Sequence, residues 1–584
     1  MDTTKEIYSI AEARARHEIS AALSAALPPD TDPSLVRIEY PPKQIEGDYV
    51  VPCFLLAKFL KQSPPAVATN LANTIKPGGL IQRVVAVGPY LNIFLDPAMF
   101  SALTLSEIYK SKDKFGKSKL GVKQRVMVEY FSPNTNKPLT VGHVRNIALG
   151  QSISKLMKFC GYKVIQSTLY NNRGIAIAKA MLGYEKWGNN ETPKTAGMKP
   201  DHFVGSFYVK FSQEANNNPA LSAEAQSMLV AWEKGDDKVT KLWQKLMGWV
   251  HEGFVQTLTK LGVGSFDEEY LESDFYQSGK EIVEKGIKKG VFIKDKDGVI
   301  VAPLEKYGLT DKIVLRPDQT SLYITQDLYL AYLKDKFNLN KSIYVVGSEQ
   351  DLYLKQLFKI LELLGFKNAD SYYHLSYGMI RLPSGKIKSR EGLIKGTGAD
   401  ELIAELEDMA KAEVLKRTPE LSDAEAQTRA EKIARAALKF YILMVGPTTT
   451  MVFDPRESLS LTGKTGPYIQ YVIARINSIF AKASVRPTSR VDFSLLQTPS
   501  ELTLVKALSQ LPHIISDSVK EYDPSKLANY LYELAKSFSA FYEQVPIVSA
   551  GKKERKARLL LIHSVRTVLS NGLGLLGIDV LEKM

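Results

Sequence analysis

The segment of the chain with the clearest chemical potential is residues 131–146, which read FSPNTNKPLTVGHVRN. It separates an apolar run from a helical pattern, so the loop ends where a helix begins. Gly142 permits close approach of the backbone to a ligand, and His143 stands at the helix start. Free N–H groups and the positive end of the helix dipole attract phosphate there. The segment predicts a site for an anionic nucleotide, although a lone Gly-His pair is more often an ordinary turn with a capping His.

The elements that would position this loop form a βαβ unit. The apolar run at 125–130 predicts a buried strand, the pattern ending at residue 159 predicts a helix, and 162–166 predicts a second strand. Such a unit implies a parallel sheet, because parallel strands need a helical crossover between them. We therefore expect an α/β Rossmann-type core.

The same α/β pattern returns later in the chain. Strands are expected at 342–347 and near 377–380, with a helix at 354–364 between them. The irregular stretch 185–310, with a hairpin signal at Asp297-Gly298, is interpreted as an insertion into this fold.

Two further regions flank the core. The N-terminal region opens with a helical pattern and ends in alternating runs, which is typical of a small α+β domain, and the last third is helical almost throughout. Ser422 and Glu425 form a capping box at the start of one helix there. The expected units are an N-terminal domain at 1–115, the Rossmann-type domain at 122–395, a helical connection at 396–455 and an all-α helical bundle at 456–584.

The bulk properties agree with a folded protein of several domains. A chain of 584 residues is too long for one hydrophobic core. Its net charge of +13 favours a polyanionic partner, although a solvated basic surface explains it equally well. The two cysteines, Cys53 and Cys160, form no CxxC pair, which argues against disulfides and a zinc site. We find no signal-peptide pattern and no apolar run of membrane-spanning length, so we expect a cytoplasmic protein.

The surroundings of the Gly-His pair favour the nucleotide site. Residues 131–146 resemble the His-x-Gly-His signature of class I aminoacyl-tRNA synthetases, preceded by the Ser-Pro-Asn-x-x-Lys-Pro lead-in typical of arginyl-tRNA synthetases. Further segments similar to that family follow in the family's order. They are 171–174 (NNRG), 266–267 with 272–273 (FD and ES), 321–327 (SLYITQD), 344–350 (YVVGSEQ), 385–392 (GKIKSREG), 465–471 (TGPYIQY) and 575–578 (LLGI).

This resemblance implies a two-step reaction. L-Arginine would be activated by Mg²⁺-bound ATP to arginyl-adenylate, and the arginyl group would then pass to the 3′ end of tRNA(Arg). The basic loop 386–390 stands for the family's second signature, where cations meet the charge of the departing pyrophosphate. The catalytic residues so implied are Lys137, Thr140, His143, Lys386 and Lys388. The implied ATP-binding residues are Pro138, Leu139, Gly142, His143, Met379, Ile380 and Ser389.

The resemblance also implies how arginine and RNA are bound. Tyr323 and Asp327 would face the guanidinium, and their spacing of four puts them on one helix face. Glu129, Asn134 and Gln350 would hold the rest of the amino acid. The bundle would bind the anticodon through Tyr468, Gln470, Tyr471 and Arg475, although core packing explains some of these residues equally well. The N-terminal domain would meet the tRNA elbow.

Three residues depart from the family pattern. Thr140 stands where the first signature histidine is expected, Asn172 where Asp is usual, and Ala176 where His often follows. The alternative interpretation is therefore a non-catalytic tRNA-binding relative with impaired activation. The retained Lys137 and Asp327 argue against it, because an RNA scaffold needs no arginine pocket. We expect a monomer that uses no zinc and binds no membrane.

Overall fold

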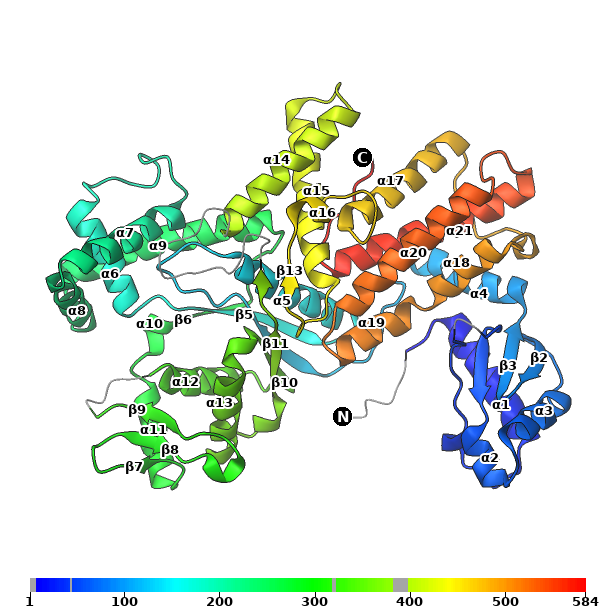
Figure 1. The fold of residues 1–584 in the computed structure, drawn as a ribbon, viewed down its shortest axis with the longest axis horizontal. Coiled ribbons are helices and arrows are strands. Elements are labelled where there is room, and N and C mark those ends of the chain that lie inside the picture. Colours follow the sequence, from blue (N-terminus) through cyan, green and yellow to red (C-terminus); the bar gives the residue numbers. More distant parts are fainter. Residues whose placement is uncertain (1–6, 43–44, 318–321, 382–397) are drawn as a thin grey trace.

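The computed structural model describes residues 7–42, 45–317, 322–381 and 398–584. Its centre is an all-parallel five-stranded sheet of order β11-β10-β4-β5-β6 (Figure 1). The strands are β4 (Arg125–Glu129), β5 (Lys163–Tyr170), β6 (Glu268–Leu271), β10 (Lys341–Gly347) and β11 (Tyr372–Tyr377). This sheet confirms the Rossmann-type core.

Helix α5 (Val141–Phe159) makes the crossover from β4 to β5. It is buried along nearly its whole length, because the sheet packs against it on one side and helices of the C-terminal bundle on another. Helices α12 (Tyr323–Asp335) and α13 (Asp351–Leu363) flank β10 in the chain. Helices α5 and α13 follow β4 and β10, so they begin at the edge where these parallel strands end.

Residues 185–310 are not one insertion, because β6 within this range pairs with β5 and completes the sheet. The first inserted unit is helical and comprises α6 (Ile175–Trp187), α7 (Pro200–Asn217), α8 (Ala220–Glu233) and α9 (Asp237–Lys260). The second, after the short α10 (Glu272–Phe275), comprises α11 (Gly279–Lys288), β7 (Ile293–Lys294), β8 (Ile300–Ala302) and β9 (Lys312–Leu315). The expected hairpin joins β7 to β8, with Gly298 at φ +83°.

The N-terminal region folds as a helix-flanked antiparallel sheet of order β1-β3-β2. Its elements are α1 (Ile10–Ala26), β1 (Tyr49–Pro52), α2 (Phe54–Leu60), α3 (Pro64–Thr74), β2 (Ile81–Val87) and β3 (Tyr90–Leu95). The next helix, α4 (Pro97–Ser111), packs mainly on the C-terminal bundle. The region predicted as 1–115 therefore ends in a helix that docks elsewhere (Figure 1).

The last third is helical, as expected. Its helices are α14 (Ala399–Arg417), α15 (Asp423–Leu443), α16 (Pro455–Ser458), α17 (Gly466–Ala483), α18 (Pro499–Ser509), α19 (Leu511–Lys520), α20 (Ser525–Gln544) and α21 (Lys552–Leu575). The capping box of α15 is confirmed, with the Glu425 N–H donating to Ser422 Oγ at 3.3 Å. A short parallel pair, β12 (Ile380–Arg381) with β13 (Met451–Val452), links the core to the helices. None of the helices among the described residues has the length and apolar character that crossing a membrane requires.

Candidate active site

The loop that follows β4 turns sharply at its first residues. Phe131 is fully buried at φ +59°, a left-handed conformation that a bulky residue seldom adopts. Its N–H donates to Asn146 Oδ1 at 2.6 Å, and Asn146 Nδ2 donates to the Val345 carbonyl at 2.6 Å. Asn146 thus fastens the loop to α5 and β10, a role that sequence reasoning did not assign.

His143 and Thr140 form one unit at the N-terminus of α5. The Thr140 N–H donates to His143 Nδ1 at 3.0 Å, and Thr140 Oγ1 lies 2.9 Å from the same nitrogen. Burial, and next the charge of Lys137, lower the pKa of His143 to about 4. The imidazole is therefore neutral near pH 7, with its proton on Nε2. It can donate a hydrogen bond to a phosphate oxygen.

Lys137 supplies positive charge to the same place. Its side chain is half-buried, and burial lowers the pKa of the ammonium. The N-terminus of α5 adds the positive end of its dipole. A partly desolvated cation beside free N–H groups is an environment that favours a phosphate.

The other residues expected to bind ATP differ in how accessible they are to a ligand. Gly142 is half-exposed and Met379 is exposed, so both are accessible to a nucleotide. The Leu139 side chain is buried and its carbonyl accepts from the Ala399 N–H at 2.9 Å, so neither group is free to contact ATP. The side chain of Ile380 is also buried, so only its main chain could meet a ligand. Pro138 is half-buried, and Lys386, Lys388 and Ser389 lie outside the described residues.

Three carboxylates converge beside this loop. Glu129 ends β4, where the Lys334 ammonium lies 2.5 Å from its Oε2. Asp327, on α12, accepts from the Tyr353 hydroxyl. Burial raises the pKa of Asp327 to about 6, and Glu129 contributes to that rise.

Glu272, the third carboxylate, was not assigned a role from the sequence. It is buried at the start of α10, directly after β6. Burial raises the pKa of Glu272 to about 7, with Arg173 lowering it and Asp327 raising it. The Arg173 guanidinium lies 3.7 Å from Glu272 and also pairs with Glu233 at 2.5 Å. Two signals in the sequence could have pointed to Glu272, namely its place directly after a strand and its place in the family-like segment 272–273.

The remaining residues expected to bind arginine surround these acids. Tyr323 is 69% exposed at the first position of α12. Asn134 and Gln350 are also exposed, one in the loop after β4 and one after β10. Asn172 is buried and bonds Ser273 twice at 2.9 Å, so this departure from the family pattern still ties the loop to the residue beside Glu272.

The bundle contains a cavity of about 1200 Å³ between α15, α17, α20, α21 and the C-terminal residues. Tyr471, Arg475 and Tyr542 line it, with the Arg475 guanidinium 4.6 and 5.1 Å from the two ring centres. Arg429, Lys482, Arg566 and Lys583 make its wall basic. The cavity offers aromatic faces and cations together.

Two residues of the predicted RNA contact set lie elsewhere. Gln470 is fully buried and donates to the Asp579 carbonyl at 2.7 Å, so it is a core residue and contact with a base is contradicted. Tyr468 is half-buried and its hydroxyl lies 2.9 Å from Ser539 Oγ. Tyr471 and Arg475 alone of the four line the cavity.

Comparison with known proteins agrees with this geometry. Residues 104–454 match the family model "tRNA synthetases class I (R), catalytic domain", 469–584 match the "DALR anticodon binding domain", and 13–95 match the "Arginyl tRNA synthetase N terminal domain". The chain is 42% identical to an arginine–tRNA ligase of Treponema denticola over 94% of this chain and 95% of that one. It is 39% identical to that of Flavobacterium psychrophilum, covering 95% and 97%.

Solved structures give the same result. The arginyl-tRNA synthetase of Thermus thermophilus superposes with a TM-score of 0.80 at 26% identity, covering 97% of this chain and all of that one. The Plasmodium falciparum enzyme superposes with a TM-score of 0.79 at 18% identity, covering both chains fully, which supports the fold alone.

Proposed function

The chain belongs to the arginyl-tRNA synthetase family, and on that premise we propose how its residues divide the reaction. The protein is an arginine–tRNA ligase that activates L-arginine with ATP and transfers it to tRNA(Arg). One observation carries the assignment of residues. The N-terminus of α5, with Lys137 near it, and a cluster of three carboxylates lie at the same carboxyl edge of one parallel sheet. Triphosphate and guanidinium need sites of these opposite charges.

In the first step the arginine carboxylate attacks the α-phosphate of ATP. The bond from the α-phosphate to the bridging oxygen breaks, and pyrophosphate leaves. Lys137 neutralises charge that grows on the phosphates, and His143 donates from Nε2 to a phosphate oxygen. By resemblance, Lys386 and Lys388 share this role. The 3′-terminal ribose hydroxyl of tRNA then attacks the arginyl carbonyl, and AMP leaves.

Magnesium enters this scheme bound to ATP. The loop itself offers a cation, N–H groups and an imidazole, which suit phosphate oxygens and not a hard cation, and we assign the carboxylates beside it to arginine. Phosphate oxygens and water would therefore be the magnesium ligands, and the ion would withdraw charge from the leaving pyrophosphate.

The acid cluster would select arginine. Asp327 and Glu272 face the guanidinium, whose planar fork matches carboxylates, and the exposed Tyr323 covers it. Glu129 keeps one carboxylate oxygen for the α-amino group while the other bonds Lys334. Asn134 and Gln350 complete the site.

Arginine-dependent exchange of pyrophosphate into ATP tests this function. We expect exchange by the wild-type enzyme that requires cognate tRNA, since the resemblance implies that tRNA helps to arrange the site. Thr140→His should raise the rate about tenfold, because a hydrogen bond of about 1–1.5 kcal/mol to phosphate would be regained. Thr140→Val, which lacks any hydroxyl, is the control. Absence of exchange in all three, with tRNA still bound, would establish the non-catalytic alternative, which none of the comparisons favours.

We further propose that the bundle cavity takes an unpaired anticodon base. Tyr471 and Tyr542 offer stacking faces, Arg475 lies between them, and the basic wall suits phosphate. We propose that the N-terminal domain contacts the tRNA elbow through an aromatic pair. Phe54, 51% exposed, meets Tyr90 edge-on at 5.8 Å between ring centres.

Tyr542→Ala should weaken tRNA binding about tenfold or more, because stacking of one base contributes about 1–3 kcal/mol. Filter binding at fixed salt measures the Kd. Tyr307→Ala is the matched control, since Tyr307 is 38% and Tyr542 39% exposed but Tyr307 lies in the second inserted unit. Equal Kd values for the two variants would place the base elsewhere. We also propose that the enzyme acts in the cytoplasm and that it is a monomer. Sedimentation of the free enzyme tests the oligomeric state.

A further inference from the structure

Helix α7 of the first inserted unit touches the loop that carries Lys137. At Gly205 an added Cβ would lie 2.7 Å from Pro138 Cδ and 3.4 Å from Lys137 Cα. A real Cβ essentially never lies under 3.0 Å from another atom, so only glycine lets the helix approach this closely. A Cβ added at Gly253 on α9 would likewise lie 2.6 Å from the backbone nitrogen of Asp201 on α7. Helix α9 therefore packs closely on α7, and α7 packs closely on the loop.

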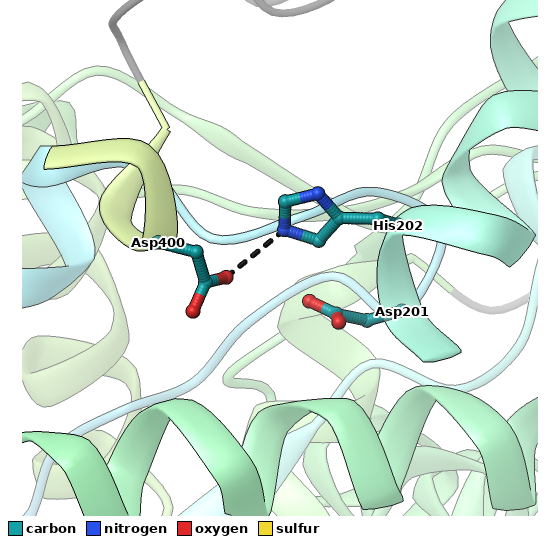
Figure 2. A group of neighbouring side chains, drawn as sticks. All are labelled: Asp201, His202 and Asp400. Atoms are coloured by element: carbon teal, nitrogen blue, oxygen red, sulfur yellow. Dashed lines mark hydrogen bonds and ion pairs between the residues drawn. The ribbon is translucent and has the colours of Figure 1, made fainter. Parts of the chain in front are cut away.

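The first turn of α7 carries a charged network, drawn in part in Figure 2. His202 Nε2 donates to Asp400 Oδ2 at 2.9 Å. The Lys199 ammonium lies 2.7 Å from Asp201 Oδ1 and 3.1 Å from Asp400 Oδ2. Thr257 of α9 donates to Asp400 Oδ1 at 3.0 Å. Asp400 thus receives three donors from two helices of the inserted unit.

Asp201, His202 and Asp400 lie close enough together to hold a metal ion. The Lys199 ammonium, however, already lies between the two carboxylates, at hydrogen-bonding distance from both. The network therefore contains its own cation, and its geometry is that of a bridge between helices.

Through Asp400 this network is also connected to the proposed phosphate site. Asp400 is the second residue of α14, whose N-cap, Gly398, pairs with Thr140 in an isolated antiparallel bridge. The Ala399 N–H donates to the Leu139 carbonyl at 2.9 Å. The start of α14 is hence hydrogen-bonded to the two residues that precede α5, and Asp400 fixes that start to α7.

We propose that Lys199, His202 and Asp400 are positioning residues for arginyl-adenylate formation. They hold α7 and the start of α14 on either side of residues 137–140, and so set the place of Lys137 and of the Thr140–His143 unit. None of the three touches a substrate. The inference rests on the proposed function, because it assumes that this loop binds the triphosphate.

Two pairs of variants test the proposal by pyrophosphate exchange. Gly205→Ala pushes a methyl group into Pro138, whereas Gly248→Ala, at an exposed position of α9 with no atom within 4 Å of the added Cβ, is its control. His202→Leu removes a donor from Asp400, whereas His202→Gln keeps one of similar reach. We expect Gly205→Ala and His202→Leu to lower kcat about 10- to 100-fold, the usual cost of misplacing a reacting group by about 1 Å. The KM for arginine and the Kd for tRNA should stay within about twofold of the wild type, since neither site is touched.

Amide hydrogen exchange supplies a readout that needs no activity. In His202→Leu, a peptide covering 139–144 should exchange faster, while peptides from the N-terminal sheet and α20 keep the wild-type rate. Recovery of both kcat and protection in His202→Gln would support positioning. The proposal is overturned if Gly205→Ala matches Gly248→Ala, or if His202→Leu lowers protection throughout the chain. A wild-type enzyme without exchange activity would refute the proposed function instead, and the protection data would still decide whether the bridge holds the loop.

Discussion

Asp327→Asn is expected to raise the KM for arginine about 100-fold while the KM for ATP stays near its wild-type value. Asp327 is half-buried and faces two other carboxylates, so its ionised form is stabilised mainly when a cation binds beside it. Removing one partner of a buried charge pair costs about 2–5 kcal/mol, and about 2.7 kcal/mol corresponds to two decades. Asp335→Asn, an Asp to Asn change on the same helix outside the acid cluster, is the control.

The pH dependence gives the same prediction an independent readout. The raised pKa values, about 6 for Asp327 and about 7 for Glu272, mean that Glu272 begins to protonate as the pH falls below about 8 and Asp327 as it falls below about 7. Arginine binds the ionised forms, so its KM should be lowest above pH 8 and should rise as the pH falls from 8 to 6. In Asp327→Asn this rise should be smaller, because one of the two titrating groups is gone. A KM that is independent of pH in the wild type would contradict the assignment.

Much of the central fold could be predicted from the sequence because its signals are local. The apolar run before the loop is a buried strand, and the capping residues mark the start of α5 and α15. Strand β6 was missed for a physical reason. It is an edge strand, Glu-Glu-Tyr-Leu, that pairs only with β5 and has no buried residue, so it lacks the apolar run that marks a central strand.

The site could be predicted only in part, because several side chains gain their roles through distant partners. The pKa of Glu272 is raised mainly by burial in the folded chain, and Arg173 and Asp327, both distant in the sequence, then act on it, so its neighbours in the sequence could not predict the shift. Thr140 was expected among the catalytic residues, but its hydroxyl and N–H both contact His143. For Gln470 a signal did exist. Ile469, Ile473 and Ile476 mark the buried face of α17, and Gln470 lies on that face, whereas Tyr471 points toward the cavity.

The hydrogen-bond partners of Asn172 and Thr140 show what these two departures from the family pattern change in the site. Asn172 keeps two hydrogen bonds to Ser273, which an Asp could not make in the same way because it has no N–H to donate. Thr140 orients the imidazole of His143 through Nδ1 and so leaves Nε2 to the substrate. Asn172 is neutral where an Asp would carry a negative charge, but its two hydrogen bonds keep the loop attached to Ser273. The groups that carry charge, Lys137 and the three acids, are all present, which is why we expect activity.

Lys137→Met should lower kcat for adenylate formation about 10²- to 10³-fold, the usual loss when one preorganised group that stabilises developing charge is removed. The KM for ATP should change far less, because the charge on the phosphates grows as the bond to pyrophosphate breaks. Lys163→Met is the matched control, since Lys163 is an exposed lysine at the opposite, N-terminal end of β5. Pyrophosphate exchange at saturating arginine and tRNA, over a range of ATP concentrations, measures kcat and the KM for ATP.

His143 allows the cause of that loss to be identified. Burial is the larger cause of its low pKa and the charge of Lys137 the second, so Lys137→Met should raise the His143 pKa from about 4 while burial keeps it below the usual value for histidine. The imidazole then stays neutral near pH 7 in both enzymes, and a changed charge on His143 cannot explain a lower kcat. Histidine NMR titration measures this pKa. If kcat fell less than about threefold, the charge that meets the departing pyrophosphate would have to come from another residue, and the assignment of Lys137 would be wrong.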